Sequence, residues 1–312
     1  MDADGNASLQ AAQEGSVTIV VVTYNSAALL PDFFGALDVA LAGVSKYEVV
    51  VADNASRDET LEVVKRLRPR ATIVALESNL GYAAGINAAV AASDRSDAIL
   101  VLNDDIRLAP GSVLTLMAEL ADSDVGVVVP RLSDGDGHLL LSQRREPTVA
   151  TSFGEAVLGG RRAGSIAGLS EVVTDPGMYG EKQDVTWASG CAWLIAARCW
   201  DAVGQWDESL FLYGEDLDYA LRLRDEGYRI RYTPDADAVH LVGPSQSNPR
   251  LWAMSMWNRY RVFARRHGRI RSALFWSGLV VNESLRSMRS SSIHRAGLSA
   301  LLFRSKRPEE VR

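Results

Sequence analysis

Short apolar runs alternate with segments of helical spacing over the first 120 residues, and this alternation restricts the fold more than any other feature of the chain. The apolar runs lie at residues 17–22, 47–52, 71–76 and 98–102. The segments with apolar residues at helical spacing lie at 27–41, 58–67 and 110–120. Strands and helices that alternate in this way build a parallel sheet with helices on both faces. The sequence therefore predicts an α/β fold with a mostly parallel central sheet.

Composition divides the chain into three segments. Residues 1–15 are polar, small and acidic, which predicts a disordered N-terminal segment. Residues 16–248 contain the α/β pattern and are expected to form the main domain, with a mobile Gly-rich loop at 154–180. Residues 249–312 are basic and have helical patterns, so we expect a helical C-terminal extension.

Cysteine usage and hydropathy predict a cytoplasmic protein. Cys191 and Cys199 are the two cysteines of the chain, a number that suits a reducing compartment and no disulfide framework. No N-terminal signal-peptide pattern is visible. The apolar stretch at 273–281 has about half the length that spans a bilayer, so we do not expect an integral membrane protein.

The net charge of -6 conceals a strong asymmetry along the chain. From Arg250 to Arg312 there are 14 Lys and Arg residues against three acids, while the other 249 residues hold 19 basic and 36 acidic residues. A basic segment on an acidic body favours an anionic partner at the C-terminal end. Because the acidic body would repel a polyanion, nucleic acid is not the expected partner.

A first group of polar side chains follows the apolar run at 98–102. Asn103, Asp104 and Asp105 stand where this predicted strand leaves the sheet. Acidic side chains at that edge are well placed to hold a divalent metal against a phosphorylated ligand. Asp105 is the better ligand because it is ionised, and Asn103 offers a neutral oxygen or an amide. An Asp-Asp pair after a strand is also common as a turn or helix N-cap, so this motif alone is not diagnostic.

A second group combines Glu215, Asp216 and Asp218 at the start of a predicted helix with His240 after a predicted strand. Asp216 is our candidate general base, which would accept the proton of an attacking hydroxyl group. Glu215 is expected to orient ligand on the acceptor side. A lone histidine is usually structural, but beside Asp105 a metal-ligand role for His240 is favoured.

The residues after the first strand argue against a hydride-transfer enzyme. A dinucleotide-binding fold needs G-x-G-x-x-G at this place, but the chain has Thr23-Tyr24-Asn25. A sugar nucleotidyltransferase would need a Gly-rich basic phosphate loop here, which is also absent. Asp53 ends the second strand, where an acid can accept hydrogen bonds from a base or ribose. Gly81 would allow a backbone segment to approach a ligand closely.

The ordered set of these motifs resembles family 2 glycosyltransferases, and it is most similar to their bacterial rhamnosyltransferase-type branch. The motifs that carry the resemblance are 20–25, 53–56, 79–87, 102–105, Gly190, 214–218 and His240. The resemblance implies a GT-A fold and an inverting transfer from a nucleoside-diphosphate sugar. Asn103 departs from the strict Asp-x-Asp metal motif, which weakens two-carboxylate chelation.

The resemblance also assigns roles to individual residues. Asp216 would be the base, and Asp105 and His240 would bind Mn²⁺ or Mg²⁺. Gly190 and Glu215 would lie on the acceptor side. The donor would be bound by Thr23, Tyr24, Asn25, Asp53, Asn54, Gly81, Asn87, Asn103 and Asp104.

The substrates are less constrained than the family. The resemblance favours dTDP-rhamnose as donor and a glycan or polyprenyl-diphosphate-linked acceptor in cell-wall or surface-polysaccharide synthesis. UDP-galactofuranose, UDP-GlcNAc and UDP-glucose stay open as donors, and so does a non-catalytic nucleotide-sugar-binding protein. Arg265 to Arg269, next to Phe275 and Trp276, suggests a peripheral contact with the inner face of the plasma membrane. Packing of this segment on the protein, including at a homodimer interface, is the alternative.

Overall fold

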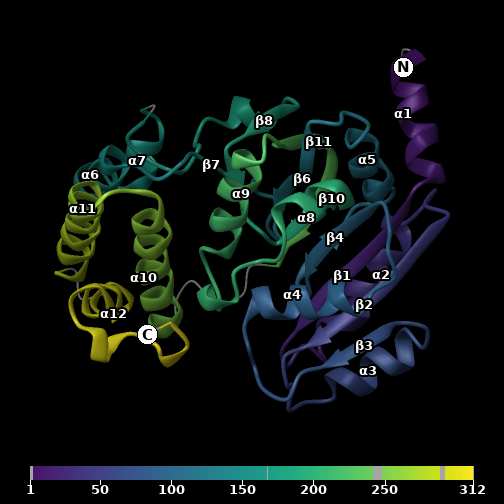
Figure 1. Ribbon diagram of the computed structural model, residues 1–312, viewed down its shortest axis with the longest axis horizontal. Coiled ribbons are helices and arrows are strands. Elements are labelled where there is room, and N and C mark those ends of the chain that lie inside the picture. The colour runs from purple at the N-terminus through teal and green to yellow at the C-terminus, as the bar shows by residue number, and fades with distance from the viewer. Residues whose placement is uncertain (1–2, 167, 242–247, 289–291, 312) are drawn as a thin grey trace.

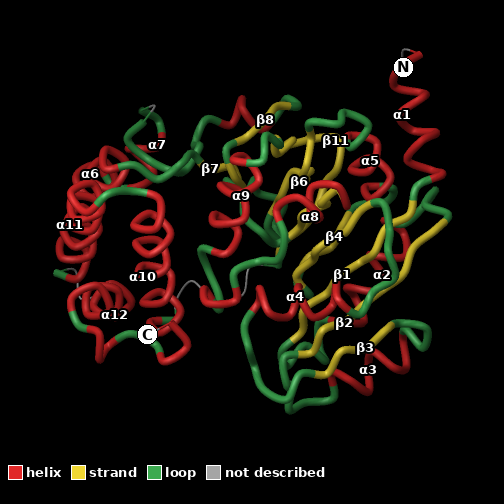
Figure 2. The backbone as a smooth tube through the Cα atoms, in the orientation of Figure 1, coloured by secondary structure: helices red, strands yellow, loops and turns green. Residues whose placement is uncertain are grey.

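A mixed, mostly parallel sheet forms the centre of the molecule in a computed structural model, which describes residues 3–166, 168–241, 248–288 and 292–311 (Figures 1 and 2). Within these residues the strand order is β3-β2-β1-β4-β10-β6-β11-β5, and β8 pairs with β11. Strands β1, β2, β3 and β4 are parallel, as are β6 and β11. The strands are β1 Ser16–Thr23, β2 Lys46–Asp53, β3 Thr72–Ala75, β4 Ala98–Asn103, β5 Ile106–Leu108, β6 Val125–Ser133, β8 Gln183–Val185, β10 Ala192–Ala196 and β11 Arg229–His240. This architecture confirms the predicted fold class.

Helices cover both faces of the sheet. In β1, Ile19 and Val21 enter one hydrophobic core and Val20 enters the other, which is the alternation of a strand buried on both sides. The first core lies under α2 Leu30–Ala40, α3 Thr60–Leu67 and α5 Ser112–Glu119. The second lies under α4 Tyr82–Ala91, α8 Ala197–Val203 and α9 Glu215–Asp225. Because both faces are buried, polar side chains gather at the strand ends.

The sequence pattern at 228–233 and 236–242 predicts two strands, but up to residue 241, where the described part of this segment ends, the structure has one long strand, β11. Its pairing with β6 is irregular between Thr233 and Asp237. Pro234 lies inside this interval and has no backbone N–H to donate to the ladder. The interruption read from the sequence is therefore a bulge within one strand, and it leaves His240 at the strand's end.

The Gly-rich segment 154–180 is less irregular than predicted. Helix α6 Val149–Leu158 extends into it, and α7 Gly160–Gly164 and a 3-10 turn at Pro176–Tyr179 follow. A Cβ at Gly154 would lie 2.3 Å from the Leu169 carbonyl oxygen, so this glycine permits close packing. A small second sheet joins β7 Gln143–Arg144 to β9 Trp187–Ala188.

The chain after residue 248 is helical, as predicted. It contains α10 Pro249–Arg266, α11 Arg269–Ser287, α12 Ser292–Leu302 and short 3-10 turns at Arg304–Lys306 and Glu309–Val311. Met256, Phe275 and Leu301 form a core between these helices, while Val262 of α10 packs on Leu217 of α9. Among the described residues, no helix has both the length and the apolar character needed to cross a bilayer.

Helix α1, Ala3–Glu14, occupies most of the segment that was expected to be disordered. Ala12 is buried in the core beneath α5, and the Gln13 carbonyl accepts a hydrogen bond of 2.7 Å from Ser45. The polar composition of residues 1–15 obscured this apolar contact, so the prediction of disorder was wrong for residues 3–14.

Four residues of the segment for which the sequence suggested membrane contact, Arg265, Arg266, Phe275 and Trp276, have partners within the protein. Arg265 forms an ion pair with Asp207, and Arg266 forms one with Asp225. Phe275 is fully buried, and the Trp276 indole N–H donates to the Leu301 carbonyl over 3.2 Å. The two arginines lie at the surface and join α10 to the catalytic domain, whereas the two aromatic rings pack within the helical region. Arg269, between these pairs in the sequence, is exposed.

Candidate active site

A cavity of about 470 Å³ opens at the carboxyl ends of β1 and β4, between the sheet and the loop that precedes α9. We call it the first cavity. Ten of the residues predicted for the site line it: Thr23, Tyr24, Asn54, Gly81, Asn103, Asp104, Gly190, Glu215, Asp216 and His240. The structure thus brings together residues that are up to 217 positions apart in the sequence. Asn25, Asp53, Asn87 and Asp105 are not part of this lining.

Asp53 uses its carboxylate inside the protein. Its Oδ1 accepts a hydrogen bond of 2.9 Å from the Thr23 hydroxyl, and its Oδ2 accepts one of 2.9 Å from the Ser56 N–H. Asn25 has a positive φ of 55° and its side chain accepts from the Arg57 N–H over 2.8 Å. Both residues shape the loops beside the first cavity. Their assignment to donor binding remains a prediction.

Asn87 and Asn54 also hold backbone segments. Asn87 is buried and exchanges hydrogen bonds of 2.9 and 3.0 Å with the backbone of Trp206. Asn54 donates to the Gly81 carbonyl over 3.1 Å. Gly81 has a φ of 94°, and a Cβ there would lie 2.3 Å from the Phe211 carbonyl oxygen. Glycine at this position therefore lets the loop before α9 close over the first cavity.

One corner of the first cavity has the chemistry of a divalent-metal site. Asp105 Oδ1 is buried without a hydrogen-bond partner and lies 3.3 Å from His240 Nε2. The His240 ring is the charge partner of this buried oxygen, and carboxylate with imidazole is a common metal-ligand set. Asn103 and Asp104 line the cavity beside them. These side chains fit Mn²⁺ or Mg²⁺.

Burial and neighbouring groups shift the pKa values of Asp104 and His240 in this corner of the first cavity. Burial is the main cause that raises the pKa of Asp104 to about 6, although a hydrogen bond from the Ser26 hydroxyl opposes the shift. Burial disfavours the charged form of His240, but Asp105 and Cys191 together raise its pKa to about 10. A bound cation would take the place of the His240 proton beside Asp105.

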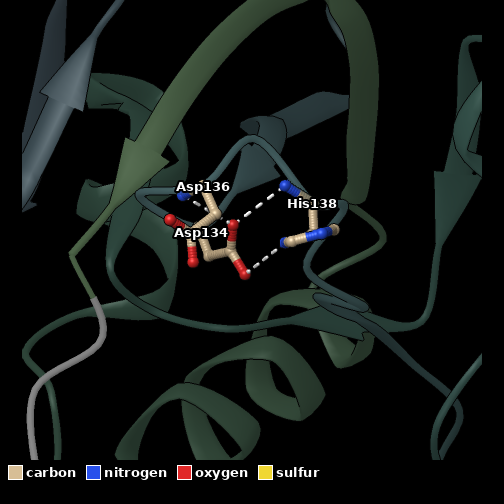
Figure 3. A group of neighbouring side chains, drawn as sticks. All are labelled: Asp134, Asp136 and His138. Atoms are coloured by element: carbon tan, nitrogen blue, oxygen red, sulfur yellow. Dashed lines mark hydrogen bonds and ion pairs between the residues drawn. The ribbon is translucent and has the colours of Figure 1, made fainter.

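A separate group of possible metal ligands lies in the turn after β6. Figure 3 shows Asp134, Asp136 and His138 side by side in this turn. Their possible ligand atoms lie within 4.8 Å of one another. The Asp134 Oδ1 accepts from the backbone N–H of Asp136 over 3.0 Å and of His138 over 2.8 Å. These are the hydrogen bonds of a side-chain-stabilised turn, and the residues line neither cavity described here.

Asp216 lies in the first turn of α9, where backbone N–H groups favour a negative charge. Its Oδ2 accepts a hydrogen bond of 3.2 Å from the Gly190 N–H, and its Oδ1 accepts one of 2.8 Å from the Leu217 N–H. A Cβ at Gly190 would lie 3.0 Å from the Asp216 Cβ, so glycine keeps this approach free. Gly190 therefore sits directly against the candidate base.

Glu215 and Asp216 are adjacent buried acids whose environments differ. Burial raises the pKa of both, and the charge of Asp216 raises that of Glu215 further. The Glu215 Oε2 has no hydrogen-bond partner, whereas Asp216 has two N–H donors and the nearby Arg144 guanidinium. Two neighbouring buried carboxylates cannot both be charged at low cost. We assign the negative charge to Asp216 and the proton to Glu215.

The loop that leads into α9 is strained, and a residue of α10 holds it. Phe211 and Tyr213 have positive φ values of 51° and 65°. The fully buried Asn258 amide donates to the carbonyls of Leu210 over 2.6 Å, Leu212 over 3.1 Å and Tyr213 over 2.9 Å. Sequence reasoning missed Asn258. Its only signal is an amide on the otherwise apolar side of an amphipathic helix.

A second cavity of about 380 Å³ begins on the other side of Asp216. Ser189, Tyr213 and Asp216 line both cavities, so the candidate base stands at their junction. The remaining walls were not predicted and come from β7, β9, α10 and nearby segments: Arg144, Glu171, Trp187, Gly214, Leu217, Leu251, Trp252, Ser255 and Arg259.

Indole rings and charged groups give the second cavity its character. The Trp187 N–H donates to the Arg145 carbonyl over 2.9 Å, and the Trp252 N–H donates to Glu283 over 2.8 Å. Since both N–H groups are used inside the protein, the rings offer the cavity mainly carbon surface. This surface suits the apolar face of a sugar ring.

The charged groups of the second cavity are held by ion pairs. Arg259 pairs with Glu155 over 2.9 Å and with Glu171. Burial raises the pKa of Glu171 to about 7, with Arg259 opposing the shift. Arg144 donates to backbone carbonyls and its charge acts on Asp216. Charged groups and aromatic surface therefore line the same cavity.

Comparison with known proteins gives one family. A sequence model described as Glycosyl transferase family 2 matches residues 18–172. The N-acetylglucosaminyl-diphospho-decaprenol L-rhamnosyltransferase of Mycobacterium tuberculosis is 29% identical over 297 residues, which cover 87% of this chain and 94% of the relative. The low-salt glycan biosynthesis hexosyltransferase Agl10 of Haloferax volcanii is 24% identical over 243 residues, which cover 76% of this chain and 71% of the relative.

Solved structures share the fold. GalNAc-T7 with UDP, GalNAc and Mn²⁺ superimposes with a TM-score of 0.62 at 14% identity, over 89% of this chain and about half (54%) of that chain. The mannosyltransferase PcManGT of Pyrobaculum calidifontis with GDP-Man and Mn²⁺ gives 0.57 at 16% identity, over 96% of this chain and 84% of that chain. At these identities the likeness establishes the common fold.

Proposed function

This chain belongs to glycosyltransferase family 2 and has the GT-A fold, and we propose that it is an inverting, metal-dependent transferase acting through Asp216. One observation carries the proposal: Asp216 stands at the junction of two cavities. The first has the Asp105–His240 corner suited to a metal and a diphosphate, and the second has aromatic surface suited to a sugar. A base between donor and acceptor is what a direct transfer requires.

The proposed reaction is a single displacement. Asp216 accepts the proton of an acceptor hydroxyl in the second cavity, and the oxygen forms a bond to the anomeric carbon of the donor in the first. The bond from that carbon to the diphosphate breaks on the opposite face, and its electron pair leaves with the nucleoside diphosphate. The configuration at the anomeric carbon is thereby inverted.

The residues of the first cavity have complementary roles in this scheme. Asp105 and His240 would hold Mn²⁺ or Mg²⁺, which neutralises charge on the leaving diphosphate. Asn103 and Asp104 would contact the donor. Thr23, Tyr24, Asn54 and Gly81 would bind the nucleoside or close the pocket around it. Asn25, Asp53 and Asn87 would act by fixing the loops.

We further propose dTDP-rhamnose as the donor and a polyprenyl-diphosphate-linked sugar as the acceptor. The support is the mycobacterial relative, whose name specifies rhamnose and a decaprenol-linked acceptor. Galactofuranose, N-acetylglucosamine and glucose donors are the alternatives. In this proposal residues 16–248 form the catalytic domain, and the extension 249–312 contributes Trp252 and Arg259 to the acceptor side.

The test combines nucleotide binding with transfer. Melting temperatures are measured with dTDP, UDP and GDP, each with Mn²⁺, Mg²⁺ or EDTA, because a ligand bound to the native state raises the melting temperature. The nucleotide with a metal-dependent shift selects the donor for a transfer assay on N-acetylglucosaminyl-diphospho-polyprenol. A shift with dTDP and formation of a rhamnosylated lipid are expected. A metal-dependent rise of the melting temperature with UDP instead of dTDP would mean that the donor is a UDP-sugar and not dTDP-rhamnose. Equal rises with metal and with EDTA would contradict the metal role.

A further inference from the structure

Exposed apolar side chains concentrate at the end of the molecule formed by α6, α7, α11, α12 and residues 302–306 (Figure 1, left). Ten of the 17 exposed large apolar side chains of the described residues lie in these elements or within two residues of their ends. Val157, Ile270 and Met288 are exposed by 73%, 79% and 81%. We call the exposed sides of these elements the helical-end surface. Scattered single apolar residues need no explanation, but a cluster of this size marks an interaction site.

Helix α11 carries a continuous apolar stripe on its outer side. Ile270, Leu274, Val281, Leu285 and Met288 are all exposed and follow one another at helical spacing. At 100° per residue these positions lie within about 60° of one another around the helix axis. The opposite side of α11 packs into the core of the helical region through buried residues such as Phe275 and Leu279. The helix is therefore apolar on two sides, and the protein covers one of them.

The charges of the helical-end surface have one sign. Glu155 and Glu283 are the only acidic residues of segments 149–166 and 269–306, and both are buried. Glu155 pairs with Arg259 over 2.9 Å, and Glu283 accepts from Trp252 over 2.8 Å. The exposed charges here are basic: Arg162, Arg269, Arg271, Arg295, Arg304 and Lys306. This contrasts with the acidic remainder of the chain.

We propose that the helical-end surface binds the headgroup region of an anionic lipid bilayer. The stripe of α11 enters the boundary between headgroups and acyl chains, while the arginines pair with lipid phosphates. The charge pattern decides between occupants. A second copy of the chain on this surface would bring like charges together around the apolar stripe, whereas an anionic bilayer neutralises them. The surface overlaps the segment 265–276, for which the sequence left membrane contact and packing open, at the exposed residues Arg269, Ile270, Arg271 and Leu274.

The helical-end surface is connected to the second cavity. Trp252 lines that cavity and donates to Glu283 of α11, and its ring packs edge-on against His294 of α12 at 5.2 Å. If the acceptor is lipid-linked, bilayer contact here would present it near Asp216; this last step rests on the proposed function. Lipid binding by the surface does not.

Sedimentation with vesicles tests the proposal on the full chain. Vesicles of phosphatidylglycerol and phosphatidylcholine are compared with vesicles of phosphatidylcholine alone. We expect the wild type to bind the anionic vesicles and Leu274→Glu to weaken binding by roughly tenfold. The matched control is Val39→Glu on α2, because Val39 is 48% exposed and Leu274 is 46% exposed. This control should bind like the wild type.

A pair of charge reversals separates specific contact from net charge. Arg269→Glu with Arg271→Glu should weaken binding by at least roughly tenfold, since each basic residue near an anionic surface contributes about 1 kcal/mol. Arg66→Glu with Arg70→Glu changes the net charge equally, at exposed positions around α3, and should have little effect. Melting temperatures of all variants confirm folding.

The outcomes are distinct. No binding of the wild type to anionic vesicles, or equal losses in the two reversal pairs, would overturn the proposal. A dimer in light scattering that Leu274→Glu dissociates, without vesicle binding, would assign the surface to a second copy. Transfer to a detergent-dispersed acceptor should be unchanged in Leu274→Glu, so failure of the surface proposal leaves the transferase proposal standing.

Discussion

The two cavities that meet at Asp216 are built in different ways. Many walls of the first cavity stand at the carboxyl ends of parallel strands and come in short motifs such as 102–105, and the others come from the segments around the starts of α4, β10 and α9. The walls of the second cavity are single side chains from β7, β9 and α10. Sheet topology alone brings strand ends together. The second cavity exists only because α10 packs against α9 and the 210–214 loop. The comparison implies that donor chemistry depends on the sheet and acceptor chemistry on the helical region.

The largest effect is expected at the residue that both cavities share. Asp216→Asn removes the proton acceptor and should lower kcat by roughly a thousandfold. Metal-dependent nucleotide binding, measured by thermal shift, should stay nearly intact. Asp225→Asn, on the exposed end of the same helix, serves as the control and should transfer normally. If Asp216→Asn turned over at nearly the wild-type rate, Asp216 would not be the general base, and the proposal that it acts between the two cavities would be wrong.

A change confined to the first cavity should affect the donor alone. Asp105→Ala removes the carboxylate beside His240 and should weaken metal-dependent nucleoside-diphosphate binding by about a hundredfold. Calorimetric titration with and without Mn²⁺ measures this effect. Binding in EDTA should be the same for the variant and the wild type. An equal loss in EDTA would mean that Asp105 supports the fold of the pocket and not a metal.

A change confined to the second cavity should affect the acceptor alone. Trp252→Ala removes ring surface and should raise the acceptor KM by about tenfold, with the donor KM unchanged. Trp252→Phe retains a ring and should restore most of the affinity. Initial-rate kinetics with each substrate varied in turn separate the two constants. A rise in the donor KM would show that the cavities are not functionally distinct.

Asn258 connects the helical region to the base. Asn258→Ala removes the amide that donates to three loop carbonyls, so Asp216 should be less well held. We expect kcat to fall by about tenfold and the free energy of unfolding to fall by about 2 kcal/mol, with both KM values nearly constant. Denaturant titration and kinetics measure the two effects. Lower stability with unchanged kcat would limit Asn258 to a structural role.

The smallest expected effect is a shift of the pH profile. The Arg144 cation lowers the pKa of Asp216 against the raising effect of burial. Arg144→Met should therefore raise that pKa, and the base would be protonated at a higher pH. The acidic limb of the kcat/KM profile should move upward by about one pH unit or less. An acidic limb that stays in place, or moves downward, would show that Arg144 does not act on the base.

The strand pattern predicted the sheet and most of the first cavity. Local residue spacing is enough to predict these features because both faces of β1 and β4 are buried. The polar residues of the site therefore follow the strands at their ends. The donor-binding roles predicted for Asp53 and Asn87 remain predictions, and the structure adds a contact that the sequence did not indicate for either residue. Each stands beside the pocket in the motif, but the side chain turns inward and holds a backbone segment. A motif gives the position of a residue and not the direction of its side chain.

The second cavity was beyond local reasoning. Arg144, Trp187 and Trp252 lie in segments without a motif, and they meet only after α10 docks on the catalytic domain. Residues 3–14 show a related limit, because one buried alanine in a polar segment decides that α1 packs. In both cases the deciding contacts join positions far apart in the sequence.

The most direct test of the central claim is a crystal structure with UDP or dTDP and Mn²⁺, with the ion located by its anomalous signal. We expect the ion between Asp105 and His240, the nucleotide in the first cavity, and the second cavity open beside Asp216. An ion bound only at Asp134, Asp136 and His138, or a nucleotide in the second cavity, would contradict it.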